Sequence, residues 1–275
     1  MDFTAVDKRI AALEATRAKP CKVSPTEPLA VGLDLGTAYI VLAVVDSRQR
    51  PVACAVQSAQ VVRDGPVVDY AGGLRMVRAL REQLEDSLGR KLEKTAIAVP
   101  PGTGERDCAT HRHVAEGAGL EVTALLDEPT AANNVLGVRD GAIVDIGGGT
   151  TGIAVLRGGQ VTYVADEPTG GTHLSLVLAG NYDVDFEAAE ALKKDPARQK
   201  EILPVVRPVI EKMGAIIQRH VAGRGVQTLY LVGGTCCLPG METIIARYTG
   251  LTARKPANPF LVTPLGIALG CGASA

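Results

Sequence analysis

Two short segments of this chain follow the same plan, and this internal repeat constrains the fold more than any other feature. They are Gly32-Leu-Asp-Leu-Gly-Thr37 and Val144-Asp-Ile-Gly-Gly-Gly-Thr150, and a further apolar stretch follows each. Short apolar runs joined by a glycine turn predict paired, buried strands. The repeat therefore predicts two similar lobes, whose two turns face a single cleft.

Apolar, β-branched segments alternate with amphipathic segments along the rest of the chain. Predicted strands occupy residues 31–46, 95–99, 122–126, 142–146, 153–156, 161–164 and 228–232. Predicted helices occupy residues 1–18, 73–92, 103–119, 131–136, 172–180, 186–194, 204–222 and 240–249, and a last helix begins near Pro264. This alternation predicts an α/β fold with mixed sheets.

The glycines of the second segment formally match the dinucleotide-binding pattern G-x-G-x-x-G, in Gly147-Gly-Gly-Thr-Thr-Gly152. That pattern needs a helix directly after the glycines, because the phosphate sits at the helix N-terminus. Here an apolar strand segment at 153–156 and a hairpin signal at 157–160 follow instead, so a Rossmann site is excluded. The sequence contains no G-x-x-x-x-G-K-[ST] either, which excludes a P-loop.

Glycine-rich turns between strands can still bind phosphate, because a backbone without side chains lets several N–H groups approach the same oxygen atoms. Thr37, Thr150 and Thr151 add hydroxyl groups, which we expect to donate to phosphate. Asp34 and Asp145 end the strands at these turns, and we expect them to hold Mg²⁺, mainly through the waters that this ion retains. A single turn of this form would indicate only a tight turn, whereas two of them favour a phosphate site.

Composition and charge argue against several classes of partner and against secretion. Lys and Arg total 29 against 30 Asp and Glu, a net charge of -1, so nothing in the charge indicates nucleic acid or an anionic membrane. No apolar run approaches the roughly 20 residues that span a bilayer, and the N-terminus carries charges where a signal peptide is apolar. The six cysteines form no C-x-x-C pair. These features predict a cytoplasmic protein with reduced thiols.

The motifs resemble, in order, those of the superfamily of actin, sugar kinases and DnaK-type heat-shock chaperones. Residues 31–37 are similar to its first phosphate motif, 145–151 to its second, and 231–235 with Pro239-Gly240 to its adenosine motif. Residues 126–132 resemble the chaperones' first connecting region, and residues 187–194 resemble a helix that contacts adenine and ribose. The resemblance implies a two-lobed actin-like ATPase fold, with ribonuclease-H-like lobes, mixed sheets flanked by helices, and a cleft that binds ATP or ADP with Mg²⁺.

The resemblance also implies how the chain is divided. Residues 1–29 form an N-terminal helix and linker, and residues 30–139 form lobe I with the first phosphate loop. Residues 140–262 form lobe II with the second phosphate loop and the adenosine motif. Residues 263–275 form a C-terminal helix that returns to lobe I.

Functional roles transfer from the superfamily position by position. Asp34 and Asp145 would lie near Mg²⁺, and Glu128 would help to orient either the attacking water or the metal shell, so these three are the predicted catalytic residues. The predicted nucleotide-binding residues are Gly36, Thr37, Gly147, Gly148, Gly149, Thr150, Thr151, Glu190, Lys193, Gly233, Gly234 and Thr235. Hydrolysis would then depend on positioning and charge neutralisation, without a covalent intermediate.

Two departures from the superfamily pattern predict slow hydrolysis, or nucleotide binding without turnover. Gly152 stands where the chaperones and bacterial actins carry an acidic residue. The segment between Arg63 and Leu74 contains no lysine to match the phosphate-contacting lysine of the chaperones.

A narrower resemblance is to a chaperone-like family encoded with bacterial ethanolamine microcompartments, through residues 61–65, 100–103, 117–122, 145–153, 165–171 and 262–265. It implies an ATP-binding protein of ethanolamine utilization that assists the assembly or maintenance of microcompartment enzymes or shell proteins. The alternatives are a nucleotide-sensing adaptor or scaffold without hydrolysis, and a small-molecule kinase, for which no motif supplies a substrate base. The N-terminal helix is expected either to dock on lobe I or to act as a microcompartment tag.

Overall fold

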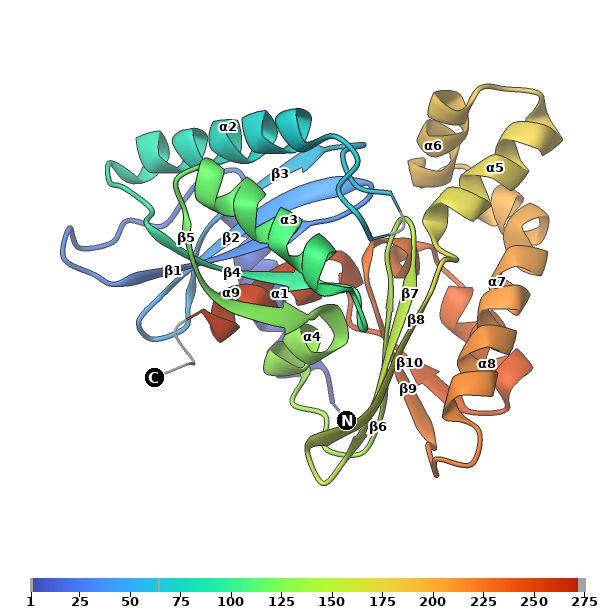
Figure 1. The fold of residues 1–275 in the computed structure, drawn as a ribbon. Coiled ribbons are helices and arrows are strands. Elements are labelled where there is room, and N and C mark those ends of the chain that lie inside the picture. The colour runs from blue at the N-terminus through green and yellow to red at the C-terminus, as the bar shows by residue number, and fades with distance from the viewer. Residues whose placement is uncertain (1, 64, 272–275) are drawn as a thin grey trace.

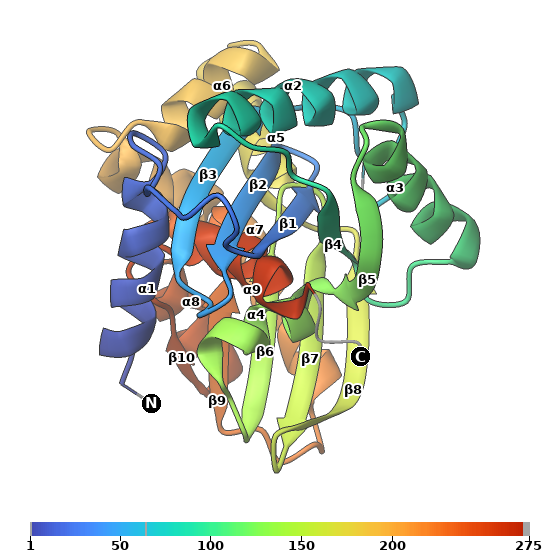
Figure 2. The ribbon, with the colours of Figure 1, turned by 90° about the vertical axis from the view of Figure 1, so that its left-hand side faces the viewer.

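The computed structural model describes residues 2–63 and 65–271 and shows two lobes, each built around a five-stranded sheet (Figure 1, Figure 2). Met1, the first residue of the predicted N-terminal helix, and residues 272–275, the last of the predicted C-terminal helix, lie outside the described residues. Both sheets contain parallel and antiparallel pairs and carry helices, so the predicted α/β class with mixed sheets is confirmed.

The sheet of lobe I has the strand order β3-β2-β1-β4-β5. Its strands are β1 (Leu29–Leu35), β2 (Tyr39–Asp46), β3 (Pro51–Ser58), β4 (Lys94–Val99) and β5 (Glu121–Asp127). The first three form an antiparallel meander, and β4 and β5 run parallel to β1. Helices α2 (Tyr70–Leu88) and α3 (Glu105–Gly117) cover one face (Figure 1). Because β2 is covered on both faces, its sequence is continuously apolar and not alternating.

The sheet of lobe II repeats this topology in the order β8-β7-β6-β9-β10. Its strands are β6 (Gly141–Ile146), β7 (Thr151–Arg157), β8 (Gln160–Glu167), β9 (Thr228–Val232) and β10 (Thr252–Arg254). Again the first three form an antiparallel meander and the last two run parallel to the first strand. Its helices are α5 (Gly171–Tyr182), α6 (Phe186–Lys194), α7 (Gln199–Val221) and α8 (Met241–Thr249). The repeat in the sequence is thus one topology used twice.

Two helices, α4 (Glu128–Leu136) and α9 (Val262–Gly270), pack together between the sheets (Figure 2). Their apolar side chains form one core with both sheets, including Val41 of β2 and Ile143 of β6. We call this cluster the shared core. It joins the lobes at the side of the molecule where β1 and β6 lie.

Glycine permits the closest approaches inside the shared core. A Cβ atom added at Gly32 of β1 would lie 2.3 Å from the backbone nitrogen of Ala268 in α9. A Cβ added at Gly266 of α9 would lie 1.9 Å from the carbonyl oxygen of Ala131 in α4. Any side chain at these positions would force α9 away from β1 or α4.

The N-terminal helix, α1 (Thr4–Ala15), is docked on the body of the protein. Its apolar face is buried in the shared core and consists of Val6, Ile10 and Leu13. The carboxylate of Asp7 accepts a hydrogen bond from the backbone N–H of Ala257 at 2.8 Å. The ring of Phe3 packs edge-on against Tyr230, with centroids 6.4 Å apart. The helix is therefore docked on the body of the protein, which is one of the two arrangements expected for it.

Three elements differ from the sequence prediction. The strands β3 and β10 were not predicted, and both lie at the edges of their sheets. β3 begins at Pro51, and a proline that lacks an N–H is tolerated in an edge strand. α7 begins at Gln199, before the predicted start at Pro204, and carries Pro204 and Pro208 inside it. Each proline removes one intrahelical hydrogen bond. Burial of Ile202 and the other apolar residues on one face of α7 offsets this loss.

Gly266→Ala should destabilise the protein, because the added methyl group would overlap the carbonyl of Ala131. Overpacking of a core lowers the free energy of unfolding by about 1–3 kcal/mol. Gly180→Ala in α5 is the control, since nothing lies within 4 Å of a Cβ added there and helix propensity predicts a gain of about 0.5–1 kcal/mol. Urea unfolding measures both variants. Equal stability of the two would contradict the close contact between α4 and α9.

Candidate functional site

A cleft of about 1580 Å³ lies between the two lobes, and both Asp-Gly-Thr turns open into it. It is lined by every predicted catalytic and nucleotide-binding residue except Thr151. The lining residues from that prediction are Asp34, Gly36, Thr37, Glu128, Asp145, Gly147, Gly148, Gly149, Thr150, Glu190, Lys193, Gly233, Gly234 and Thr235. Residues more than 200 positions apart in the sequence are therefore brought to one site by the fold.

The two turns are built alike and touch each other. In the first, the N–H of Gly36 donates to the carbonyl of Tyr39 at 3.0 Å, and in the second, the N–H of Gly147 donates to the carbonyl of Thr150, also at 3.0 Å. A Cβ added at Gly148 would lie 3.1 Å from Cβ of Ala38 and 3.3 Å from Cβ of Thr37. The absence of a side chain at Gly148 thus lets the backbones of the two turns come together at the base of the cleft.

The backbone of the second turn has donors to offer to an anion. In the part of the chain that the structure describes, neither Gly148 nor Gly149 has an acceptor for its N–H group. Gly149 is nevertheless buried, and buried N–H groups without a partner are rare in proteins. Unpaired N–H groups in a glycine turn are the arrangement that binds phosphate oxygens, so this loop fits a nucleotide phosphate.

Three carboxylates face one another across the base of the cleft. Burial and the charge of Asp145 raise the pKa of Asp34 to about 7. Burial also raises the pKa of Asp145 to about 6, and the Thr263 hydroxyl, which donates to its Oδ2, opposes the shift. Burial and the charges of Asp145 and Asp34 raise the pKa of Glu128 well above its usual range. The shared cause is burial, which makes the charged form of each carboxylate costly, and repulsion between neighbouring carboxylates adds to the shift at Asp34 and Glu128.

Mg²⁺ is a suitable cation for this set of ligands. Within residues 2–63 and 65–271, no group of three or more His, Cys, Asp or Glu side chains is close enough to ligate a metal directly. Mg²⁺ usually keeps several waters and takes one or two carboxylates together with phosphate oxygens. Asp34 and Asp145, one from each lobe, are the residues that would hold the hydrated ion.

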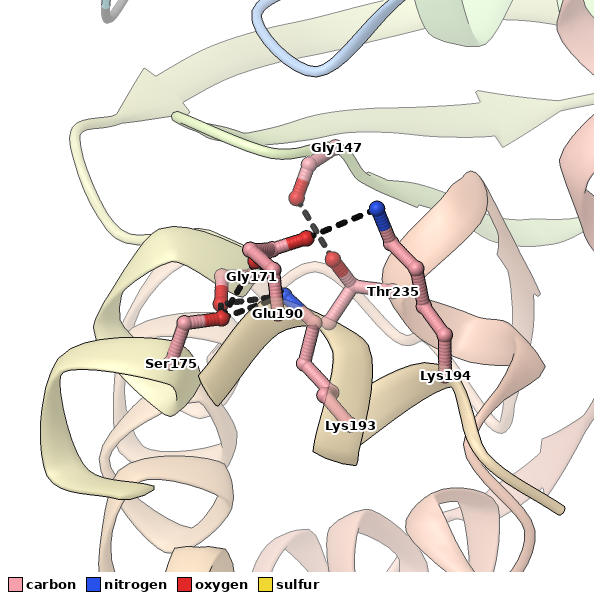
Figure 3. Close-up of polar contacts among 7 residues, drawn as sticks. All are labelled: Gly147, Gly171, Ser175, Glu190, Lys193, Lys194 and Thr235. Carbon is pink, nitrogen blue, oxygen red and sulfur yellow. Dashed lines mark hydrogen bonds and ion pairs between the residues drawn. The ribbon is translucent and has the colours of Figure 1, made fainter. Parts of the chain in front are cut away.

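The predicted adenosine side of the cleft is a connected polar network (Figure 3). The ammonium group of Lys193 donates to the carbonyl of Gly171 at 2.9 Å, to the hydroxyl of Ser175 at 2.7 Å, and to Glu190. These contacts use all three protons of Lys193. The hydroxyl of Thr235 donates to the carbonyl of Gly147 at 2.7 Å and so ties the adenosine motif to the second turn.

The hydroxyl of Thr151 points away from the cleft. Thr151 is fully buried, and its Oγ1 donates to the carbonyl of Thr169 at 2.6 Å. The expectation that this hydroxyl donates to phosphate is therefore wrong for the described arrangement, because its one proton is already used. Thr151 instead anchors the second turn to the segment that precedes α5.

Sequence reasoning missed a contact that spans the mouth of the cleft. The ammonium group of Lys194, in lobe II, lies 4.8 Å from the ring centre of Tyr39 in lobe I and 3.0 Å from Oε2 of Glu190. The ring of Tyr39 also packs edge-on against Phe260, with centroids 5.2 Å apart. The available signal was the position of Tyr39 two residues after Thr37, where β2 begins at the cleft.

Comparison with known proteins identifies the family. The chain is 47% identical over 242 residues to the ethanolamine utilization protein EutJ of Salmonella typhimurium, covering 88% of this chain and 85% of that protein. It is 44% identical over 257 residues to EutJ of Escherichia coli, covering 92% and 91%. The chain belongs to the EutJ family.

The solved structure of EutJ from Carboxydothermus hydrogenoformans matches with a TM-score of 0.90 at 48% identity, and covers 96% of this EutJ-family chain and 97% of its own. More distant structures share the fold alone. MreB5 of Spiroplasma citri, solved with ADP, matches with a TM-score of 0.69 at 16% identity. The PilM-PilN type IV pilus biogenesis complex matches with 0.71 at 17% identity. The expected actin-like ATPase fold is confirmed.

Two further comparisons find similarity to a pilus assembly family and to a chaperone. The family model described as Type IV pilus assembly protein PilM matches residues 113–266. A chaperone protein HscA homolog of Aliivibrio fischeri is 25% identical and covers 78% of this chain but only 42% of its own length. Within the described part of the EutJ-family chain, no helix is both long and apolar enough to cross a membrane.

The carboxylates of the cleft predict a pH dependence of stability in the absence of nucleotide. The pKa of Asp34 rises from 3.8 to about 7 on folding. Between these values the folded protein binds more protons than the unfolded chain, so the free energy of unfolding falls as the pH rises through this window and levels off above it. Asp34→Asn removes this contribution and should flatten the decline between pH 5 and 7.

Thermal unfolding across pH 5–8 measures this effect as the difference between wild type and Asp34→Asn. Taking the difference cancels the other groups that contribute to the pH dependence of stability in both proteins, such as the buried His111. Asp86→Asn, on the exposed face of α2, is the control and should run parallel to wild type. Parallel curves for Asp34→Asn and wild type would contradict the charge accumulation at the cleft.

Proposed function

We propose that this EutJ-family chain binds ATP with Mg²⁺ in the cleft and acts as a chaperone-like assembly factor of ethanolamine utilization, with slow hydrolysis. The observation that carries the proposal is the contact between the two turns. Gly148 lies against Thr37 and Ala38, and the cleft that holds its unpaired N–H group is also lined by a carboxylate from each lobe, Asp34 and Asp145. Such a site offers donors for phosphate and oxygen ligands for a hydrated divalent ion.

Each element of the site has a distinct task in this proposal. Gly148 and Gly149 would donate their N–H groups to phosphate oxygens, and Asp34 and Asp145 would hold the hydrated ion. Bound ATP supplies the phosphoanhydride bond, and Mg²⁺ neutralises charge on the phosphates. Glu128, the first residue of α4, faces the same space and would orient a water for attack. Its carboxylate could also take a proton from that water.

Slow hydrolysis is supported by the positions of the two lysines in the cleft, which are both engaged by other side chains. Lys193 is held by three acceptors, and Lys194 lies with Tyr39 and Glu190 at the mouth of the cleft. Positive charge aimed at the transferred phosphoryl group accelerates such reactions strongly, by about 10³–10⁵-fold for an arginine in related chemistry. In this proposal none of the cations that line the cleft, which also include Arg17 and Arg63, is aimed at the transferred phosphoryl group. The nucleotide would then persist, and its energy of binding would serve to hold the lobes in one arrangement.

The proposed partners are microcompartment enzymes or shell proteins in the cytoplasm. The support is the EutJ family itself, whose name places it in ethanolamine utilization, together with the chaperone relationship seen at 25% identity. Purified protein that binds ATP but changes the assembly of no microcompartment component would refute the chaperone part of the proposal.

A second candidate is a nucleotide-sensing adaptor that does not hydrolyse ATP. The PilM family match over residues 113–266, and the structural similarity to PilM in complex with PilN, favour it. In this alternative the two lobes would present a partner-binding surface that depends on bound nucleotide, and Glu128 would be dispensable.

Glu128→Gln distinguishes the two candidates. Calorimetry should show Mg-ATP bound by the variant as tightly as by wild type or more tightly, because a negative charge near the phosphates is removed. Phosphate release should fall by about 10²-fold or more. Glu121→Gln, exposed at the start of β5, is the control and should match wild type. Binding without release by wild type would establish the adaptor, and no binding would refute both candidates.

A further inference from the structure

Residues 233–238, which we call the η1 loop, are closely packed where they border the cleft. Gly233 has a φ of 91°, and a Cβ atom added there would lie 2.3 Å from Oδ1 of Asp145. A Cβ added at Gly234 would lie 3.3 Å from Cδ2 of Phe260. The residues of this loop that line the cleft are Gly233, Gly234, Thr235, Cys237 and Leu238. A small displacement of the η1 loop would therefore change the space that is open to a nucleoside.

A lysine outside the cleft holds the last residues of the η1 loop. Lys255 lies between β10 and the short helix η2 (Pro259–Leu261), and it is not among the described residues that line the cleft. Its ammonium group donates to the carbonyl of Cys236 at 2.8 Å and to the carbonyl of Leu238 at 3.1 Å. It also forms an ion pair with Oε2 of Glu242 in α8, at 2.9 Å. These three contacts match the three protons that an ammonium group carries.

This ion pair is largely removed from solvent. The side chain of Lys255 is 17% exposed, and Oε2 of Glu242 is buried. Replacing a buried ion pair by apolar residues often leaves the stability of a protein unchanged or raises it, because both charges have lost their hydration. Stability alone therefore does not account for a lysine at this position. An apolar side chain would not bind the two loop carbonyls, so the fixed position of the η1 loop is what the lysine adds.

The segment that carries Lys255 is itself anchored. The backbone N–H of Ala257 donates to the carboxylate of Asp7 in α1 at 2.8 Å. At the other end of the η1 loop, the hydroxyl of Thr235 donates to the carbonyl of Gly147 in the second turn. The loop is thus tied at one end to the turn that is proposed to bind phosphate, and at the other end to Lys255.

We propose that Lys255 is a positioning residue of the nucleotide site, which holds the η1 loop in the shape that accepts a nucleoside. The inference rests on the proposed nucleotide function and deepens it, because it assigns part of the nucleotide affinity to a residue outside the cleft. Lys255 acts through backbone carbonyl groups, so its side chain determines where Gly234 and Cys237 lie. Without the ammonium group the η1 loop would have to be ordered when nucleotide binds, and that ordering would reduce the affinity.

Calorimetry with Mg-ATP tests the proposal on two variants that both lack the ion pair. Glu242→Gln keeps the ammonium group on the loop carbonyls, and its ATP dissociation constant should stay within about twofold of wild type. Adding Lys255→Met removes the ammonium group as well, and this double variant should bind ATP about five- to tenfold more weakly than Glu242→Gln, the effect expected of the lost hydrogen bonds. Lys212→Met, at an exposed position of α7, is the control and should match wild type.

A conservative variant separates positioning from a merely structural role. In the Glu242→Gln background, Lys255→Arg should stay within about twofold of Glu242→Gln, because a guanidinium group can donate to both carbonyl groups. Lys255→Gln, which retains an amide donor, replaces Lys255→Met if that variant does not fold, and should weaken ATP binding about two- to fivefold.

Two results would overturn the inference alone. One is that Lys255→Met, or Lys255→Gln in its place, binds ATP as tightly as the Glu242→Gln background. The other is that Lys255→Arg loses as much affinity as Lys255→Met or its replacement. Absence of ATP binding by wild type would overturn the proposed function and the inference with it.

Discussion

The geometry of the cleft depends on the apolar core that the two lobes share. α4 and α9 contribute side chains to this core together with β2, β6 and β7, and they approach β1 and each other at Gly32 and Gly266. Close-packed interiors resist deformation, so this core fixes the distance between the turns that follow β1 and β6. The outer parts of the lobes meet through fewer contacts, such as Lys194 with Tyr39. A bound nucleotide would act on those outer contacts, since the base of the cleft is already set.

Electrostatics then determines what the cleft can hold. Asp34, Asp145 and Glu128 converge where burial makes ionisation costly, and the raised pKa values of all three record that cost. Backbone N–H groups without acceptors lie beside them in the second turn. A ligand that brings both a cation and phosphate oxygens satisfies the carboxylates and the donors together. Neither a cation nor an anion alone would do so, which is the physical reason to propose a metal-bound nucleotide.

Much of the site was predictable, because its residues lie in short segments whose chemistry is local. An Asp at the end of an apolar run, followed by glycine and threonine, indicates a strand and a phosphate turn wherever it occurs, and the order of the motifs indicated the fold. Other features depend on neighbours that are remote in the sequence. The hydroxyl of Thr151, for example, donates to the carbonyl of Thr169, which follows β8. The edge strand β3, which begins at Pro51, was likewise missed because its pairing with β2 decides its structure.

The sequence by itself determined the class of the fold, the two turns, and the glycines, threonines and carboxylates that the turns bring to the cleft. Periodicity, glycine and strand-ending aspartates act through neighbouring residues in the chain. Only the tertiary structure decided how these residues are used. It buried the apolar face of α1 in the shared core, paired Lys193 with Glu190 and Ser175, and placed Lys194 over Tyr39. Such contacts join elements far apart in the sequence, and their geometry follows from the packing of two lobes around one core, which no local pattern records.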